Sequence, residues 1–243
     1  MLSQHVLQVA GVSKRFGGLH VTRDIASRLG GLISENDVSP AGAVIAFTSS
    51  LMIWGWLEMS FLMGFITGPR RTPCPLGARG WNRARYALEA VLHHELALLA
   101  GGVIVTVLTL DAANQTGLWT YMILWALRTS AKLNVFLGVR NLSEAFLPDH
   151  LRYLQTYFTR RPMNLLFPFT VIASTTVATL LWRTAIAAPD GSFEAVSLGF
   201  LATLLSLAVL EHWFLVLPIP ADVLWKWGMG SRERKDAKAA ASA

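Results

Sequence analysis

The sequence predicts an all-α protein: a polytopic integral membrane helix bundle with about five transmembrane helices and one short cytoplasmic amphipathic helix. Of the 243 residues, 53% are apolar and only 15% are charged, which is a low charge content for a soluble domain of this length. Several apolar runs reach about 20 residues, the length of a membrane-spanning helix. The nine tryptophans are also typical of a membrane protein, because an indole ring sits favourably at the membrane–water interface.

Five spans follow from length and hydropathy. They are expected at about 41–66, 84–109, 117–138, 163–187 and 194–217. The loops after the first and third spans and the C-terminal tail are rich in Arg and Lys, whereas the other two loops contain neither. This alternation predicts a multi-pass protein with its basic loops and its C-terminus in the cytoplasm.

The segment between the third and fourth spans carries apolar residues at helical spacing, namely Leu147, Leu151, Leu154 and Phe158. Polar residues lie between them. This pattern predicts the short amphipathic helix, lying on the cytoplasmic face of the membrane.

Three regions are expected along the chain: an atypical N-terminal segment at 1–35, a transmembrane helical domain at 36–228 and a disordered basic tail at 229–243. The N-terminal text LQVAGVSKRFGGLHVTRDI is weakly similar to the opening strands of an ABC-transporter ATPase. No GxxxxGK[ST] motif occurs in the sequence, so we exclude ATP binding. The basic residues alternate between loops and form no single patch, which argues against a nucleic-acid partner.

Ionisable residues inside the spans are the candidate site. Charges in hydrocarbon cost several kcal/mol, about 2.5–3.5 on insertion scales, so each is expected to face the bundle interior and to have a partner. We predict that they form a buried polar cluster in the cytoplasmic half of the bilayer. Its members are Glu58, Glu89, His93, His94, Glu95, Arg128, Lys132, Glu211 and His212.

Three interpretations of this cluster stay open. It could be an interhelical salt-bridge network that fixes helix register, a metal or pigment-magnesium site, or a proton or substrate path. His93, His94 and Glu95 are successive, so each points about 100° from the last and all three cannot enter one site. The metal is unknown, and no fixed-spacing ligand motif is present.

Arginine pairs stand in the two basic loops, at Arg70–Arg71 and at Arg160–Arg161. Their first interpretation is a topology signal. The second is docking of membrane lipids, anionic ones in particular, or of a partner protein.

Four strings carry a resemblance to a known family: WGWLEMSFLMGFITGPRRTPCP, RYALEAVLHHELALL, RTSAKLNVFLGVRNLSEAFLPDHLRYLQTYFTRRPMNLLFP and LLSLAVLEHWFLVLPIP. From about residue 36 to 227 the chain closely resembles the PuhE family of purple phototrophic bacteria. The resemblance implies a multi-pass inner (intracytoplasmic) membrane protein that assists assembly of the photosynthetic reaction centre and core antenna and the supply of bacteriochlorophyll. It transfers no catalytic residue. It also implies about two further apolar spans ahead of NDVSPAGAVIAF, which this sequence lacks.

The leading hypothesis is therefore a non-enzymatic assembly factor whose partners are reaction-centre or antenna subunits, with bacteriochlorophyll or a metal ion as a possible ligand. One alternative is a membrane-embedded, metal-dependent enzyme of bacteriochlorophyll metabolism. It would use Glu58, His94, Glu95, Glu211 and His212. Another alternative is a transporter of pigment or precursor, which would depend on Arg128 or Lys132.

Overall fold

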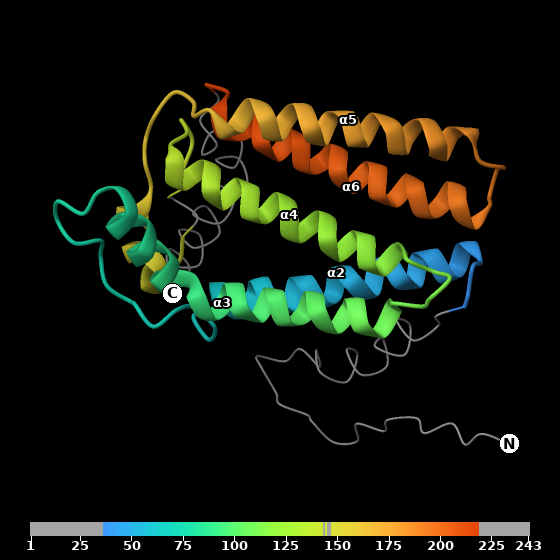
Figure 1. Cartoon of the computed structure of the whole chain (residues 1–243), viewed down its shortest axis with the longest axis horizontal. Coiled ribbons are helices and arrows are strands. Elements are labelled where there is room, and N and C mark those ends of the chain that lie inside the picture. Colours follow the sequence, from blue (N-terminus) through green and yellow to red (C-terminus); the bar gives the residue numbers. More distant parts are fainter. Residues whose placement is uncertain (1–35, 143, 145–146, 219–243) are drawn as a thin grey trace, which may run out of the picture. The chain divides into compact units, whose positions relative to one another are not determined.

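The computed structural model describes residues 36–142, 144 and 147–218, and within them it contains five long α-helices and one 3₁₀-helix. No strand occurs in that part of the chain, where Val139 and Arg160 form one isolated parallel bridge. The all-α prediction is confirmed. In chain order (Figure 1) the elements are α2 (Pro40–Leu62), α3 (Gly80–Thr109), α4 (Thr116–Leu137), η2 (Asp149–Tyr157), α5 (Leu166–Ala187) and α6 (Phe193–Val216).

Four of the helices, α2, α3, α5 and α6, are long and apolar enough to cross a membrane. In the apolar stretch of each of these helices, only 17–39% of the residues are buried within the protein. The remaining apolar surface is far larger than a water-soluble protein exposes, so it fits contact with lipid. Helix α4 has a lower mean hydropathy in its most apolar stretch than these four helices have, because that stretch includes Arg128, Lys132 and Asn134. Its passage through the membrane stays a prediction.

Helix α2 illustrates how local chemistry sets the helix ends. Pro40 is its first residue, and the Ser39 hydroxyl accepts a hydrogen bond from the Gly42 amide at 3.1 Å, which is an N-cap followed by a favourable N1 proline. At the other end Gly64 adopts φ +79°, and the Phe65 amide donates to the Ser60 carbonyl at 2.9 Å. This glycine-terminated motif ends the helix at Leu62 and not near residue 66, where hydropathy alone places the end of the span.

The described residues divide into two compact units, and each of the five long helices contributes to both. Unit 1 comprises residues 36–59, 96–125 and 179–204 of the described chain. Its core is apolar and aromatic. The rings of Trp54 and Tyr121 meet edge to face with centroids 5.3 Å apart. They pack with three buried aliphatic side chains, those of Leu57, Leu98 and Val105.

Unit 2 comprises residues 60–95, 126–178 and 205–218 of the described chain, apart from positions 143, 145 and 146. Its core joins α2 and α3 to η2. Phe61 and Ala90 are buried against one face of η2, which is formed by Leu151, Leu154 and Tyr157.

The amphipathic segment is confirmed as a helix, but its geometry differs from the prediction. The buried residues of η2 are spaced by three, as a 3₁₀-helix requires, because side chains at i and i+3 eclipse one another. Tyr157 therefore occupies the buried face, and the predicted face member Phe158 lies at its edge and is partly exposed.

Candidate functional site

An ion pair between two helices is the most direct polar contact among the predicted site residues. Lys132 of α4 lies 2.7 Å from a carboxylate oxygen of Glu95 of α3, and each side chain is about one quarter exposed, at 26% and 23%. In a low-dielectric environment each charge offsets the cost of burying the other. The pair fits the interpretation of the cluster as an interhelical salt bridge.

The three successive polar residues of LHHEL face three different environments. His93 is exposed, His94 is fully buried and Glu95 turns toward Lys132. The His94 ring packs on Phe61 with ring centroids 4.5 Å apart. His93 is predicted to be a member of the buried cluster but does not belong to it, since a step of one residue turns a helix by about 100°.

The main chain at this point of α3 is bonded to the loop that precedes it. The His94 amide donates to the Thr67 carbonyl at 2.9 Å, and the Glu89 carbonyl accepts from the Arg70 amide at 3.3 Å. Gly68 lies directly against the helix between these two bonds. A Cβ at Gly68 would stand 2.2 Å from the Glu89 carbonyl oxygen and 2.5 Å from the Ala90 carbonyl carbon. Only glycine allows the loop to approach α3 so closely.

A group of hydrogen-bonded side chains surrounds the buried His212 of α6. One ring nitrogen, Nδ1, lies 2.8 Å from the Ala208 carbonyl, which can only accept, so Nδ1 donates this hydrogen bond. The other, Nε2, lies 3.1 Å from the Ser130 hydroxyl of α4. Ser130 also bonds the Thr170 hydroxyl of α5 at 3.0 Å. His212 thus joins three helices, whereas its neighbour Glu211 is exposed and does not belong to the buried cluster.

Asn164 is a second junction that sequence reasoning missed. Its carbonyl oxygen accepts the amides of Leu166 and Phe167 and so caps the start of α5. Its amide group donates to the Asn134 side chain at 3.0 Å and to the Gly138 carbonyl at 2.9 Å. An Asn placed just before an apolar run is a helix-start signal that could have identified it.

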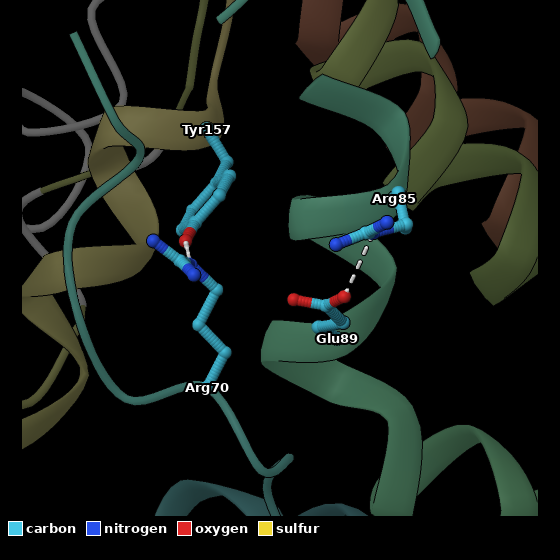
Figure 2. Close-up of polar contacts among 4 residues, drawn as sticks. All are labelled: Arg70, Arg85, Glu89 and Tyr157. Carbon is cyan, nitrogen blue, oxygen red and sulfur yellow. Dashed lines mark hydrogen bonds and ion pairs between the residues drawn. The ribbon is translucent and has the colours of Figure 1, made fainter. Parts of the chain in front are cut away.

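Arg70 is the centre of a polar contact at the loop between α2 and α3 (Figure 2). Its Nε donates to the Tyr157 hydroxyl at 2.9 Å, and that hydroxyl donates in turn to the Thr72 carbonyl at 2.9 Å. The hydrogen bond from Arg70 to the Tyr157 hydroxyl raises the pKa of the Arg70 guanidinium. Burial raises the pKa of the Tyr157 phenol. Tyr157 therefore ties the basic loop to η2.

The Tyr86 ring of α3 lies next to two guanidinium groups. The guanidinium carbon of Arg70 stands 4.6 Å from the ring centroid, and that of Arg85 stands 5.5 Å from it. Arg85 also forms an i,i+4 ion pair with Glu89 at 3.0 Å. Glu89 therefore lies at this loop and pairs with Arg85, apart from the Lys132–Glu95 pair.

The other arginines of the two basic loops differ in how they are held. Arg83, in the first turn of α3, donates to the carbonyls of Phe136 and Tyr157 and to the Thr159 hydroxyl. It therefore joins α3 to the end of α4 and to the end of η2. Arg160 pairs with Glu144 at 3.2 Å. Three members of the predicted docking set are exposed: Arg71, Arg160 and Arg161.

The structure brings together only part of the predicted cluster. Glu58 belongs to unit 1 and Arg128 belongs to unit 2. Both residues are partly buried. Among residues 36–142, 144 and 147–218, no three His, Cys, Asp or Glu side chains gather so that they could hold a metal ion. The ligand set of the metal-enzyme alternative is therefore not assembled by the described residues. Of Arg128 and Lys132, the two residues named for the transporter alternative, Lys132 is paired with Glu95.

Comparison with known proteins gives two matches. A family model described as "protein of unknown function (DUF3623)" matches residues 17–236. An uncharacterized 30.4 kDa protein in the puhA 5' region of Rhodobacter capsulatus is 41% identical over 202 residues, which cover 82% of this chain and 73% of that protein. No solved structure matches the chain. The chain therefore belongs to the DUF3623 family of proteins of unknown function.

Proposed function

We propose that the protein is an accessory membrane protein for assembly of the photosynthetic reaction centre and core antenna, including the supply of bacteriochlorophyll. The observation that carries the proposal is the similar protein of Rhodobacter capsulatus, which lies in the puhA 5' region. The puhA gene encodes the reaction-centre H subunit. The resemblance to the PuhE family points in the same direction.

Structural features agree with an accessory role. Four helices are long and apolar enough to cross a membrane, and the loops of unit 2 are fixed by Arg83 and Tyr157. A fixed loop region presents the same groups to each incoming subunit. We propose that reaction-centre or antenna subunits dock on this region through Arg160 and Arg161. By the distribution of basic loops, it faces the cytoplasm from the inner (intracytoplasmic) membrane.

A clean deletion of the gene in a phototrophic host tests the proposal. The absorption bands of the assembled reaction centre and core antenna are expected to fall, while transcripts of their subunits stay unchanged. The unmodified gene supplied in trans should restore the bands. Normal levels of both complexes in the deletion strain would contradict the assembly role.

Pigment analysis of the same strain separates assembly from metabolism. An assembly factor predicts fewer complexes without one dominant pigment precursor, whereas a metabolic enzyme predicts that its substrate accumulates. Accumulation of a single precursor would replace the proposal with the enzyme alternative.

A further inference from the structure

The contact between Arg70, Arg85 and Tyr86 has a feature that the assembly role does not use. Two guanidinium groups lie within 6 Å of one aromatic ring. Figure 2 shows the guanidinium of Arg85 directed toward the side on which Arg70 and Tyr157 lie. Each guanidinium has five N–H donors, and the bonds to Tyr157, Pro73 and Glu89 use only some of them. The remaining donors are available to an oxyanion.

The local charge is strongly positive. Residues 63–89 contain five arginines and a single carboxylate, that of Glu89. In the second basic loop, by contrast, Arg152 and Arg160 each have a carboxylate partner, in Asp149 and Glu144. An anion is therefore attracted more strongly to the loop between α2 and α3 than to the second loop.

The length of α3 places this site at the level of lipid headgroups. The helix has 30 residues and is therefore about 45 Å long, whereas the hydrocarbon layer is about 30 Å thick. Roughly ten residues must extend beyond the layer. Arg83, Arg85 and Glu89 lie in the first ten residues of the helix, whereas Glu95 lies deeper and is paired with Lys132. Trp81, 81% exposed, stands in the first turn as an interfacial residue would.

We infer that Arg70 and Arg85 bind the phosphate group of an anionic phospholipid of the membrane in which the helices lie. The two guanidinium groups hold the phosphate oxygens from two elements of unit 2, the loop and α3. The Tyr86 ring and the Tyr157 hydroxyl keep Arg70 in place. The acyl chains lie along the exposed apolar face of α3, which includes Leu88.

Native mass spectrometry of the full-length protein tests the inference. The protein is extracted from an equimolar mixture of phosphatidylglycerol and phosphatidylcholine, and the bound lipids are counted. The unmodified protein is expected to retain phosphatidylglycerol in preference. Arg85→Gln is expected to lower that retention about fivefold. Arg152→Gln is the matched control, since it removes the same charge from an exposed arginine of unit 2.

Each outcome decides the question. A specific site is supported if Arg85→Gln loses bound phosphatidylglycerol while Arg152→Gln retains it. Equal loss in both variants shows a general surface-charge effect and overturns it. If millimolar inorganic phosphate displaces the bound phosphatidylglycerol, the ligand is free phosphate and not a lipid, and the inference is overturned. Unchanged retention of phosphatidylglycerol in Arg85→Gln also overturns it.

Two further controls protect the interpretation. Because Arg70→Gln also breaks the bond to Tyr157, the more exposed Arg85 is the primary position. The thermal unfolding temperature of Arg85→Gln should equal that of the unmodified protein. The assay contains no photosynthetic subunit, so its result does not depend on the proposed function.

Discussion

Units 1 and 2 share the same five long helices but are stabilised in different ways. In unit 1 the links described between elements are neutral: aromatic packing of Trp54 on Tyr121, and the hydroxyl pair Thr116–Ser197 at 2.7 Å. In unit 2 the links include charges, such as Lys132–Glu95 and the bonds of Arg83. Charged links between helices are costly unless their geometry is kept, so unit 2 has to be the more constrained of the two.

The largest expected effect is at the contact between the loop and α3. Gly68→Ala would place a methyl group 2.2 Å from the Glu89 carbonyl oxygen, and the atoms it meets are main chain and cannot rotate away. We expect a loss of about 3 kcal/mol or more in the free energy of unfolding, measured by denaturation in detergent micelles.

Gly55→Ala is the control in unit 1, because a Cβ at Gly55 meets nothing within 4 Å. It should leave stability unchanged or raise it by about 0.5–1 kcal/mol, since alanine is the better helix former. Equal effects of the two substitutions would remove the contrast between the units.

The next effect concerns the ion pair. Lys132→Met or Glu95→Gln alone should lower the free energy of unfolding by about 2 kcal/mol, because each leaves a partly buried charge without its partner. The double variant should lose less than the sum, with a coupling energy of about 1 kcal/mol. The same cycle on Thr116→Ala and Ser197→Ala measures a neutral pair of unit 1 and should give a smaller coupling. Strict additivity at Lys132–Glu95 would show that the pair contributes nothing.

A smaller effect is expected at Tyr157. Tyr157→Phe removes the hydroxyl that joins Arg70 to the Thr72 carbonyl, which should cost about 1 kcal/mol. Tyr86→Phe retains the ring beside the two arginines and is expected to be neutral. If both variants unfold at the same temperature, the Tyr157 hydroxyl does not stabilise the loop.

The smallest effect is a pH dependence. Burial raises the pKa of Tyr153 and of Tyr157 above that of a free phenol, so the folded protein disfavours phenolate. Their stabilising contribution is complete below about pH 10, and it is lost as the pH rises through the raised pKa values of the folded state. The fall in thermal unfolding temperature above about pH 10 should therefore be shallower in Tyr157→Phe than in the unmodified protein.

Most of the fold could be predicted because membrane helices are marked by the length of their apolar runs. The predicted span 194–217 and the observed Phe193–Val216 differ by one residue at each end. The largest boundary errors are at the two ends next to basic loops: α2 ends at the Gly64 motif, and α3 begins at Gly80 and not at residue 84. At these ends local turn chemistry, and not hydropathy, sets the boundary.

The candidate site was less predictable, because spacing gives the relative direction of two residues on one helix but not which direction faces a neighbour. Hence His94 and His212 are buried, and His93 and Glu211 are exposed. The contacts that loop residues make could not be predicted from hydropathy or helical spacing either. Nothing in the sequence indicates that Tyr157 would meet Arg70, which stands 87 positions earlier.

The close approach of Gly68 to α3 has a mechanical consequence. Thr67 and Arg70 are fastened to the helix backbone on either side of that glycine, so the arginine-bearing loop and the first turns of α3 move as one rigid piece. If α3 changes its tilt in the bilayer, both guanidinium groups travel with it. Conversely, when a molecule bound to those guanidinium groups moves, its motion is transmitted directly to helix α3.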